Sequence, residues 1–266
     1  MKLVESLRKG LEVMEAFSSQ NPRLRLQEVA RFTGQPKATA YRLLRTLMSL
    51  GYVKYDKHSM MFYLGPRVMS LGYTVLSSLD LRELAQPYLE DLSQKTQQNV
   101  NLGILDRAEV IYVERIKKRQ ILNIDLFVGS RLPSHSSSIG QAILAYLPQD
   151  KLQAVIDIMM ADEAAAAEIG RDGAVLKEKL AEVRQNGYAL NDQENYIGLR
   201  AVAAPLFDRN GMVEGAVNVA AFSQLTNREE LLQKHLPWLL TTVASISRSR
   251  GYRAEEALKQ GSFQPA

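Results

Sequence analysis

The sequence contains no cysteine among its 266 residues, and no apolar run approaches the length of a transmembrane helix. The first absence excludes disulfides, thiolate zinc sites and cysteine nucleophiles. A helix that crosses a bilayer needs about 20 apolar residues in succession, so none is predicted. The first segment, "MKLVESLRKGLEVMEAF", alternates charged and apolar residues and lacks the apolar core of a signal peptide. We therefore expect a cytoplasmic protein.

Patterns of catalysis and metal binding are also scarce. His58, His135 and His235 are far apart in the sequence, and no two of them have the spacing of metal ligands. The serine-rich segment around His135 lacks the G-x-S-x-G elbow of a serine hydrolase, and no partner for His135 can be named. No metal site, cofactor or enzyme activity is predicted. A hydrolase with a serine of this segment as its nucleophile is kept as an alternative.

The charged residues are divided unevenly along the chain. Residues 1–70 hold 12 Lys and Arg against 5 Asp and Glu, a net charge of +7, whereas the remaining residues hold 21 against 24, a net charge of −3. The length suits two domains, and the apolar content of 46% allows each a proper core. A basic first quarter on a mildly acidic body favours nucleic acid as the partner of the first part.

The segment of residues 34–53, "GQPKATAYRLLRTLMSLGYV", predicts a short helix with one aliphatic face. Pro36 suits the first helical position, and Gly51 ends the helix. Apolar residues recur at the i, i+3, i+4, i+7 spacing of a face that packs on a core. They are Ala40, Leu43, Leu44, Leu47 and Leu50. The same geometry directs Arg42 and Arg45 away from that core.

The order of elements around this helix is that of a winged helix-turn-helix. Helical spacing predicts a first helix over residues 4–17 and a second helix that ends at Gly34, and a two-stranded ribbon with a basic tip follows the third helix. In such folds the third helix enters the major groove, while the ribbon contacts phosphates or the minor groove. The predicted DNA-contacting residues are Lys37, Ala38, Thr39, Tyr41, Arg42, Arg45, Lys57, His58 and Arg25.

The rest of the chain mixes helices and strands, which predicts an α+β domain. Strands are expected at residues 100–106, 109–116 and 121–128, helices at 139–147, 150–160 and 174–187, a hairpin at 200–222 and a closing helix at about 228–249. We divide the chain into a winged helix-turn-helix domain (1–65), a linker helix (66–80), a second domain (81–250) and a tail (251–266).

Three stretches resemble the IclR family of bacterial transcriptional regulators. They are "PKATAYRLLRTLMSLGYV" with "YLGPRVMSLG" after it, "VGSRLPSHSSSIGQAILAYLP", and "GYALNDQENYIGLRAVAAPLFDRNG". The resemblance covers residues 4–250. It implies a winged helix, a linker helix, a GAF-like effector-binding domain, dimers that can pair into tetramers, and small organic acids as effectors.

The resemblance also implies where the acid binds. The backbone of Ser138 and Ile139, beside Gly140, would contact it. The residues themselves also favour an acid there, because Ser136, Ser137 or Ser138 could cap the helix or donate to a carboxylate. Side chains would come from Asn191, Ala201, Asn218 and Ala220, and the apolar walls from Ile121, Leu132 and Leu199. Better-known acid-binding members carry a carboxylate at the position of Asn191 and hydroxyls at those of Asn218 and Ala220. Because amide and methyl groups offer different hydrogen bonds, a different ligand is expected.

The predicted function is that of a ligand-responsive regulator that binds a near-palindromic operator as a dimer and represses or activates transcription. An acid bound in the second domain would bias the arrangement of the dimer or tetramer through the linker helix. A non-specific, architectural DNA binder with a second domain that only dimerises is kept as a further alternative.

Overall fold

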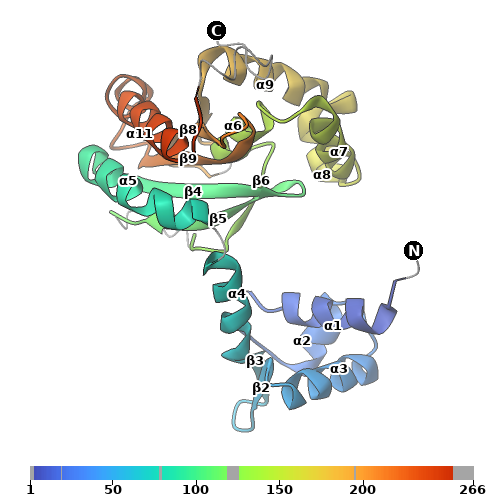
Figure 1. The fold of residues 1–266 in the computed structure, drawn as a ribbon. Helices are drawn as coiled ribbons and strands as arrows, with labels where there is room; N and C mark the ends of the chain where they lie inside the picture. Colours follow the sequence, from blue (N-terminus) through green and yellow to red (C-terminus); the bar gives the residue numbers. More distant parts are fainter. Residues whose placement is uncertain (1–2, 19, 78–79, 119–125, 195, 254–266) are drawn as a thin grey trace. The chain divides into compact units, whose positions relative to one another are not determined.

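The computed structural model describes residues 3–18, 20–77, 80–118, 126–194 and 196–253 (Figure 1). Contacts within the chain divide it into two compact units, residues 1–78 and residues 79–266. In the described part of the chain, no helix is long and apolar enough to cross a membrane.

The described residues of unit 1 form four helices and a small antiparallel sheet of strand order β1-β3-β2. Its elements are α1 (Glu5–Glu15), β1 (Arg23–Leu24), α2 (Leu26–Phe32), α3 (Lys37–Ser49), β2 (Val53–Asp56), β3 (Met61–Leu64) and α4 (Arg67–Ser77). Gly34 has a φ of 63° in the turn between α2 and α3, a conformation that glycine adopts without strain. The helices and the ribbon expected from the sequence are confirmed.

The core of unit 1 joins the three-helix cluster to the sheet. Val13, Phe17, Val29 and Leu44 are buried in it, together with Phe62 from the ribbon. Of the expected aliphatic face of α3, Ala40 and Leu44 are buried, and Leu43 and Leu47 are half-buried and pack against the core. Leu50 is 48% exposed, because α3 ends at Ser49 and Leu50 is its C-cap, so the prediction that Leu50 faces the core is wrong.

The apolar spacing of α1 does not mark a buried face. Leu7 and Leu11 are exposed, and the helix contributes Val13 to the core instead. The exposed apolar residues of unit 1 also include several on α4, whose Met69 and Tyr73 are 76% and 73% exposed.

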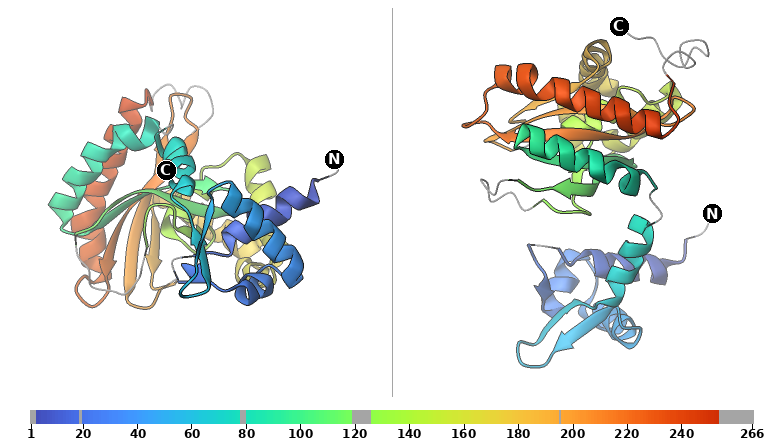
Figure 2. Two further views of the ribbon diagram at one scale, coloured as in Figure 1. Left: turned by 90° about the horizontal axis from the view of Figure 1, so that it is seen from below. Right: turned by 60° about the vertical axis from the view of Figure 1, so that its left-hand side comes forward.

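Unit 2 is an α+β domain built on an antiparallel sheet of strand order β6-β5-β4-β9-β8-β7. Its strands are β4 (Asn99–Asp106), β5 (Glu109–Ile116), β6 (Arg131–Pro133), β7 (Ala189–Asp192), β8 (Leu199–Phe207) and β9 (Val213–Phe222). Helix α5 (Asp80–Thr96) packs on β4 and β5, and α11 (Leu236–Ser249) packs beside it on β8 and β9 (Figure 2). The fold class predicted from the sequence is confirmed.

A second group of helices of unit 2 lies on the other face of the sheet (Figure 2). They are α6 (Ser138–Leu144), α7 (Gln149–Met160), α8 (Glu163–Ile169) and α9 (Ala174–Asn186), with a 3-10 turn at Arg171–Gly173 before α9. Ile139 and Ile143 of α6 are buried against this face together with Leu180 of α9.

Two expected elements of unit 2 differ from the structure. The closing helix is interrupted: α10 (Arg228–Glu230) is followed by a π-turn (Leu231–His235) before α11 begins. The strand expected over residues 121–128 is not found in its described part, where residues 126–128 form no strand. Residues 121–125 lie outside the described residues.

Candidate functional site

Helix α3 presents a cationic face on unit 1. The helix follows Pro36, which is its N-cap and not, as expected, its first residue. Ala40 and Leu44 are fully buried and fix its orientation, so that Lys37, Arg42 and Arg45 are exposed on its other side. The helix carries no acidic residue. A polyanion that approaches this face therefore meets no repulsive charge from the helix.

The two arginines of this face differ in their surroundings. Arg45 Nη1 lies 3.5 Å from Tyr41 Oη, and its guanidinium carbon lies 6.0 Å from the centre of the Tyr41 ring. The Arg42 guanidinium forms no hydrogen bond or ion pair with any described residue. Ala38 is exposed and Thr39 is half-buried beside them. Tyr41 thus restrains the Arg45 side chain, whereas no described residue restrains the Arg42 guanidinium through a hydrogen bond or an ion pair.

The turn between β2 and β3 carries the other predicted contacts. Lys57 and His58 are both exposed there, and Asp56 shapes the turn. The Asp56 carboxylate accepts hydrogen bonds from Ser59 Oγ at 2.8 Å and from the backbone N–H of His58 at 2.9 Å. The hydrogen bond from Ser59 and that from the His58 backbone lower the pKa of Asp56. The carboxylate therefore stays charged as it holds the basic tip.

Arg25 lies beside the third strand of this sheet, as expected. It precedes α2 as the N-cap, and its backbone N–H donates to Glu28 Oε2 at 2.7 Å. The Arg25 side chain is exposed. The neighbouring Arg23 is paired with Asp56 at 3.4 Å and stacks on Tyr63. Among the described residues, Arg25 forms no ion pair, whereas Arg23 does.

In unit 2, the face of the sheet that packs on α6 carries a buried polar cluster. Two rows of register partners cross it, and they are two residues apart on each strand, so both rows lie on one face. One row is Asn191, Ala201, Ala220 and Asn99, and the other is Ala203, Asn218, Asn101 and Arg115. The predicted effector-contacting residues of β7, β8 and β9 are therefore brought together.

A chain of hydrogen bonds links this cluster. Arg115 Nη1 donates to Asn101 Oδ1 at 3.1 Å, and Asn101 Nδ2 donates to Asn218 Oδ1 at 2.7 Å. Asn218 Nδ2 in turn lies 3.4 Å from Ser138 Oγ of α6. Asn101 and Asn218 are 1% and 3% exposed. Burial raises the pKa of the neighbouring Tyr112 to about 12, so its phenol stays neutral.

The start of α6 is capped by its own serine. Ser137 Oγ accepts a hydrogen bond from the Gly140 N–H at 3.1 Å, so the expected capping role is confirmed for Ser137. The N–H groups of Ser138 and Ile139 form no hydrogen bond with any described residue, although both residues are buried. A buried N–H without a partner is costly. These two groups are available to a ligand.

Gly140 has a packing role. A Cβ at this position would lie 2.1 Å from the carbonyl oxygen of Ser134, so only glycine allows the serine-rich loop to fold back on α6. Asn191 holds the same loop from the other side. Its Nδ2 donates to Ser136 O at 2.5 Å, and its Oδ1 accepts from the Glu194 N–H at 3.2 Å.

The predicted apolar walls are only partly described. Leu132 is buried on β6, and Leu199 is half-buried at the start of β8, two residues before Ala201 and therefore on the same face of the strand. Ile121 lies outside the described residues. Asn101, Tyr112 and Arg115 join the cluster without having been predicted. The alternation of Asn99 and Asn101 in "NVNL" was the one available signal.

Ionisable groups near the serine-rich loop are paired. His135 Nε2 lies 2.9 Å from Glu168 Oε2, so the expectation that no partner can be named for His135 is corrected. Glu194 is paired with Lys179, and Asp192 with Arg200. Ser134 Oγ donates to Ala108 O. The hydroxyls of Ser134, Ser137 and Ser138 thus make hydrogen bonds other than one to His135.

Two family models match the chain. The helix-turn-helix domain of IclR matches residues 6–57, and the C-terminal domain of the bacterial transcriptional regulator IclR matches residues 73–248. The chain is similar to the regulator XynR of Escherichia coli K12, with 30% identity over 96% of this chain and 100% of that protein.

Solved structures agree with this match. An IclR family transcriptional regulator from Brucella abortus has 30% identity and a TM-score of 0.78 over 93% of each chain. An IclR homologue from Microbacterium hydrocarbonoxydans in complex with 4-hydroxybenzoate has 21% identity and a TM-score of 0.74, over 92% of this chain and 98% of that one. At this identity the second likeness concerns the fold alone.

Proposed function

Because this chain belongs to the IclR family of bacterial transcriptional regulators, we propose that it binds a near-palindromic operator as a dimer and that a small organic acid controls its occupancy. It is a transcriptional regulator with a helix-turn-helix domain and an effector-binding domain. The operator, the effector class and the oligomeric state are the parts that we propose. A cytoplasmic location follows from contact with chromosomal DNA.

The cationic face of α3 is the observation that carries the DNA-binding part. A helix of 13 residues with no acidic side chain and with Lys37, Arg42 and Arg45 exposed fits the major groove in shape and in charge. Lys57 and His58 on the ribbon tip are exposed, as is Arg25, and we expect them to contact the flanking backbone. Phosphate contacts of this kind set the register of a protein on DNA, whereas base contacts set the sequence.

Exposed apolar residues of unit 1 support the dimer. Leu7 and Leu11 on α1 are 63% and 51% exposed, and Met69, Leu71 and Tyr73 on α4 are each at least half exposed. Exposed apolar side chains on two helices of a small domain are unfavourable in water and are typical of a surface that a partner covers. We propose that a second copy covers them, which would place two α3 helices in successive major grooves.

The buried polar cluster supports an acid as the effector. The N–H groups of Ser138 and Ile139, which have no hydrogen-bond partner among the described residues, are suited to a carboxylate. Ala201 and Ala220, which are register partners, present only methyl groups to the same face and leave the amide of Asn218 beside them. A planar acid with a second polar group fits such a surface, and 4-hydroxybenzoate, bound in the Microbacterium homologue, is one example.

The test begins with the operator. Selection of duplexes from a randomised DNA library by the full-length protein is expected to give a near-palindrome with half-sites about one helical turn apart. The control is the variant Arg42→Ala, Arg45→Ala, which should select nothing, while its circular dichroism and its melting temperature match those of the wild type. Selection of no motif by the wild-type protein would contradict the proposal.

The effector is tested by a thermal-shift screen of carboxylic acids that includes 4-hydroxybenzoate. An acid at 100 times its Kd should stabilise the protein by about 2.7 kcal/mol. The same acid must change the affinity for the selected operator, because a ligand that binds both arrangements equally shifts nothing. A screen without a stabilising acid would leave a DNA-binding regulator of another ligand class.

A further inference from the structure

An irregularity in β5 determines which of its side chains reach the polar cluster. Leu102 of β4 is the register partner of Glu114, but the next residue, Gly103, is the partner of Tyr112. Val113 is therefore an extra residue on β5 with no partner opposite it, which defines a β-bulge.

The bulge changes the phase of the strand. In a regular strand, Tyr112 and Arg115 would point to opposite faces, because they are three residues apart. With Val113 extruded, their register partners are Gly103 and Asn101, which are two residues apart and share a face. Tyr112 and Arg115 therefore both reach the face that holds the amide chain.

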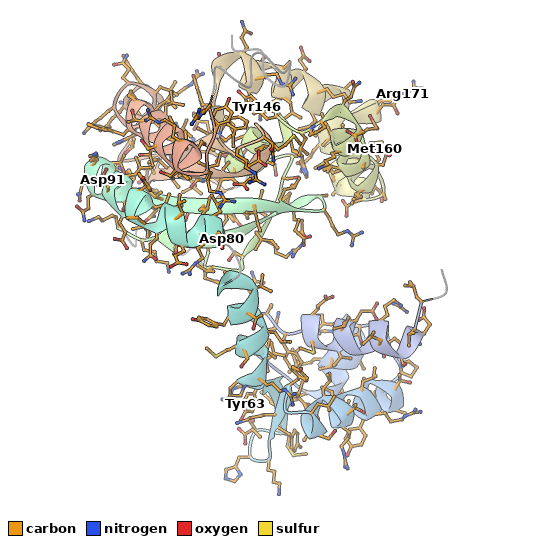
Figure 3. The ribbon with its side chains drawn as sticks, viewed as in Figure 1. Tyr63, Asp80, Asp91, Tyr146, Met160 and Arg171 are labelled. Carbon is orange, nitrogen blue, oxygen red and sulfur yellow. The ribbon has the colours of Figure 1, made fainter. Side chains whose placement is uncertain are left out.

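The bulge is held from the opposite face by Arg82. Arg82 is on the first turn of α5, two residues after Asp80, which is labelled in Figure 3. Its Nε donates to the carbonyl oxygen of Val113 at 3.1 Å, and its Nη2 lies 2.8 Å from Glu114 Oε2. The second contact is an ion pair and not an aligned hydrogen bond.

The surroundings make this contact stronger than a surface ion pair. The side chain of Glu114 is 10% exposed and that of Arg82 is 33% exposed. The other oxygen of Glu114 accepts a hydrogen bond from the N–H of Arg115 at 2.9 Å. One guanidinium thus contacts the bulged carbonyl and a carboxylate that is itself bonded to the backbone of a cluster residue.

We infer that Arg82 is a positioning residue that couples the polar cluster to the DNA-binding unit. It fixes the bulge that presents Tyr112 and Arg115 to the effector, and a shift of the bulge when an effector binds moves Arg82 and the first turn of α5. Along the chain, α5 (from Asp80) comes next after α4 (to Ser77), so the covalent chain is the route by which a change in the first turn of α5 would be passed to unit 1. This inference rests on the proposed function. A β-bulge places the extra residue at one position of the strand or at another, with no arrangement between them, so the strand pairing can have two distinct states.

The test uses operator DNA as the ligand, so that no effector needs to be known. Coupling between two sites is reciprocal, so operator binding to unit 1 must change the bulge if the bulge reports to unit 1. Hydrogen exchange is measured by mass spectrometry on the full-length protein, with the selected operator and with a scrambled duplex of the same length. The peptides of interest cover β5 and the first two turns of α5.

In the wild type, the operator is expected to change the exchange rates of both peptides by about fivefold or more, which is the lower end of typical coupling. In Arg82→Ala, the change in β5 is lost, while the operator is still bound. Arg131→Ala is the matched control: Arg131 contacts Glu109 and Asp106 at 2.7 Å each, at the far end of the same strand pair, and its loss should leave the response intact.

Two conservative variants separate positioning from stability. The ammonium group in Arg82→Lys can pair with Glu114, but it lacks the planar guanidinium donors that also contact the carbonyl of Val113. Arg82→Lys is therefore expected to melt near the wild-type temperature and still to lose most of the response in β5. Glu114→Gln keeps the contact with the bulged carbonyl and should keep part of the response. Arg82→Lys also provides the test if Arg82→Ala does not fold.

An Arg82→Lys or Arg82→Ala protein that transmits the full change to β5 would overturn the inference. So would a wild-type protein that binds the operator with no change in β5, which leaves DNA binding untouched. A wild type that binds no specific DNA is a failure of the proposed function, and it removes the basis of the inference as well.

Discussion

Replacing Arg42 and Arg45 one at a time by alanine should separate reading of bases from contact with phosphates. Both side chains lie on the cationic face of α3, but only Arg45 is held, by Tyr41. Arg42 is closer to the start of the helix, where recognition helices approach base edges. We therefore expect Arg42 to contact a base and Arg45 to contact a phosphate.

The magnitudes follow from the two copies in a dimer. A bidentate contact between arginine and guanine contributes about 1–3 kcal/mol of discrimination. Because a dimer makes this contact in two half-sites, Arg42→Ala should weaken the free energy of binding to the operator by about 2–6 kcal/mol. The loss of binding free energy in Arg42→Ala should be much smaller on a scrambled duplex. Each phosphate contact contributes about 0.9 to the slope of log K against log salt, so Arg45→Ala should lower that slope by about 1.8 per dimer.

The assay is fluorescence anisotropy with the operator and with a scrambled duplex, each titrated at several salt concentrations. Tyr41→Phe keeps the ring beneath Arg45 and removes only the 3.5 Å contact with the hydroxyl, so it should give a smaller part of the Arg45→Ala effect. Arg171→Ala is the control, because Arg171 is a 95% exposed cation of unit 2 (Figure 3).

Equal losses on both duplexes for Arg42→Ala, together with a lowered salt slope, would reverse the assignment of the two arginines. Unchanged affinity in both single variants and in the double variant would refute the reasoning as a whole, because the face of α3 would then lie away from the DNA.

Three further outcomes test unit 2 and its stability. Gly140→Ala brings a Cβ against Ser134 O and should lower the free energy of unfolding, measured with urea, by about 1–3 kcal/mol. Gly10→Ala is the control, because Gly10 lies on a helix with open space around it and its replacement should not destabilise the protein. Equal effects of the two variants would contradict the packing role of Gly140. Ala220→Leu should abolish the thermal shift produced by an acid and retain operator binding, and an undiminished shift would exclude this face as the site. Burial lowers the pKa of His235, so below its ordinary value of 6.5 the unfolded chain binds a proton that the folded chain does not. Stability should fall with falling pH in that range by up to about 1.4 kcal/mol per unit, and His235→Leu should remove this dependence; a variant with the wild-type pH profile would contradict it.

Local patterns in the sequence predict unit 1 well. The spacing of Ala40 and Leu44 identifies the buried face of α3, and Gly34 marks the turn before it, because both signals act within a few residues. The error at Leu50 arises at a helix end, where one residue decides between a buried turn and an exposed cap. Leu7 and Leu11 show a different limit of prediction from sequence. The same apolar spacing is found in a helix that packs on its own core and in a helix that contacts a second chain.

The polar cluster of unit 2 was only partly predictable. Its residues on β7, β8 and β9 follow from the resemblance to the family, but Asn101 meets Asn218 across 117 residues of sequence. The contact of Arg82 with Val113 depends on a bulge, and a bulge depends on the register of two paired strands. Neither register nor the π-turn before α11 leaves a periodic signal in the sequence. These features require the assembled sheet.

The amide chain in the cluster has a direction. Because a guanidinium can only donate, Arg115 requires the oxygen of Asn101 on its side, which turns the Asn101 nitrogen toward Asn218 and the Asn218 nitrogen toward α6. Rotating either amide would set two donors or two acceptors against each other. The Arg115 guanidinium on β5 thus determines that Asn218 of β9 turns a hydrogen-bond donor, and not an acceptor, toward α6, so a group that took the place of Ser138 Oγ would have to accept that hydrogen bond.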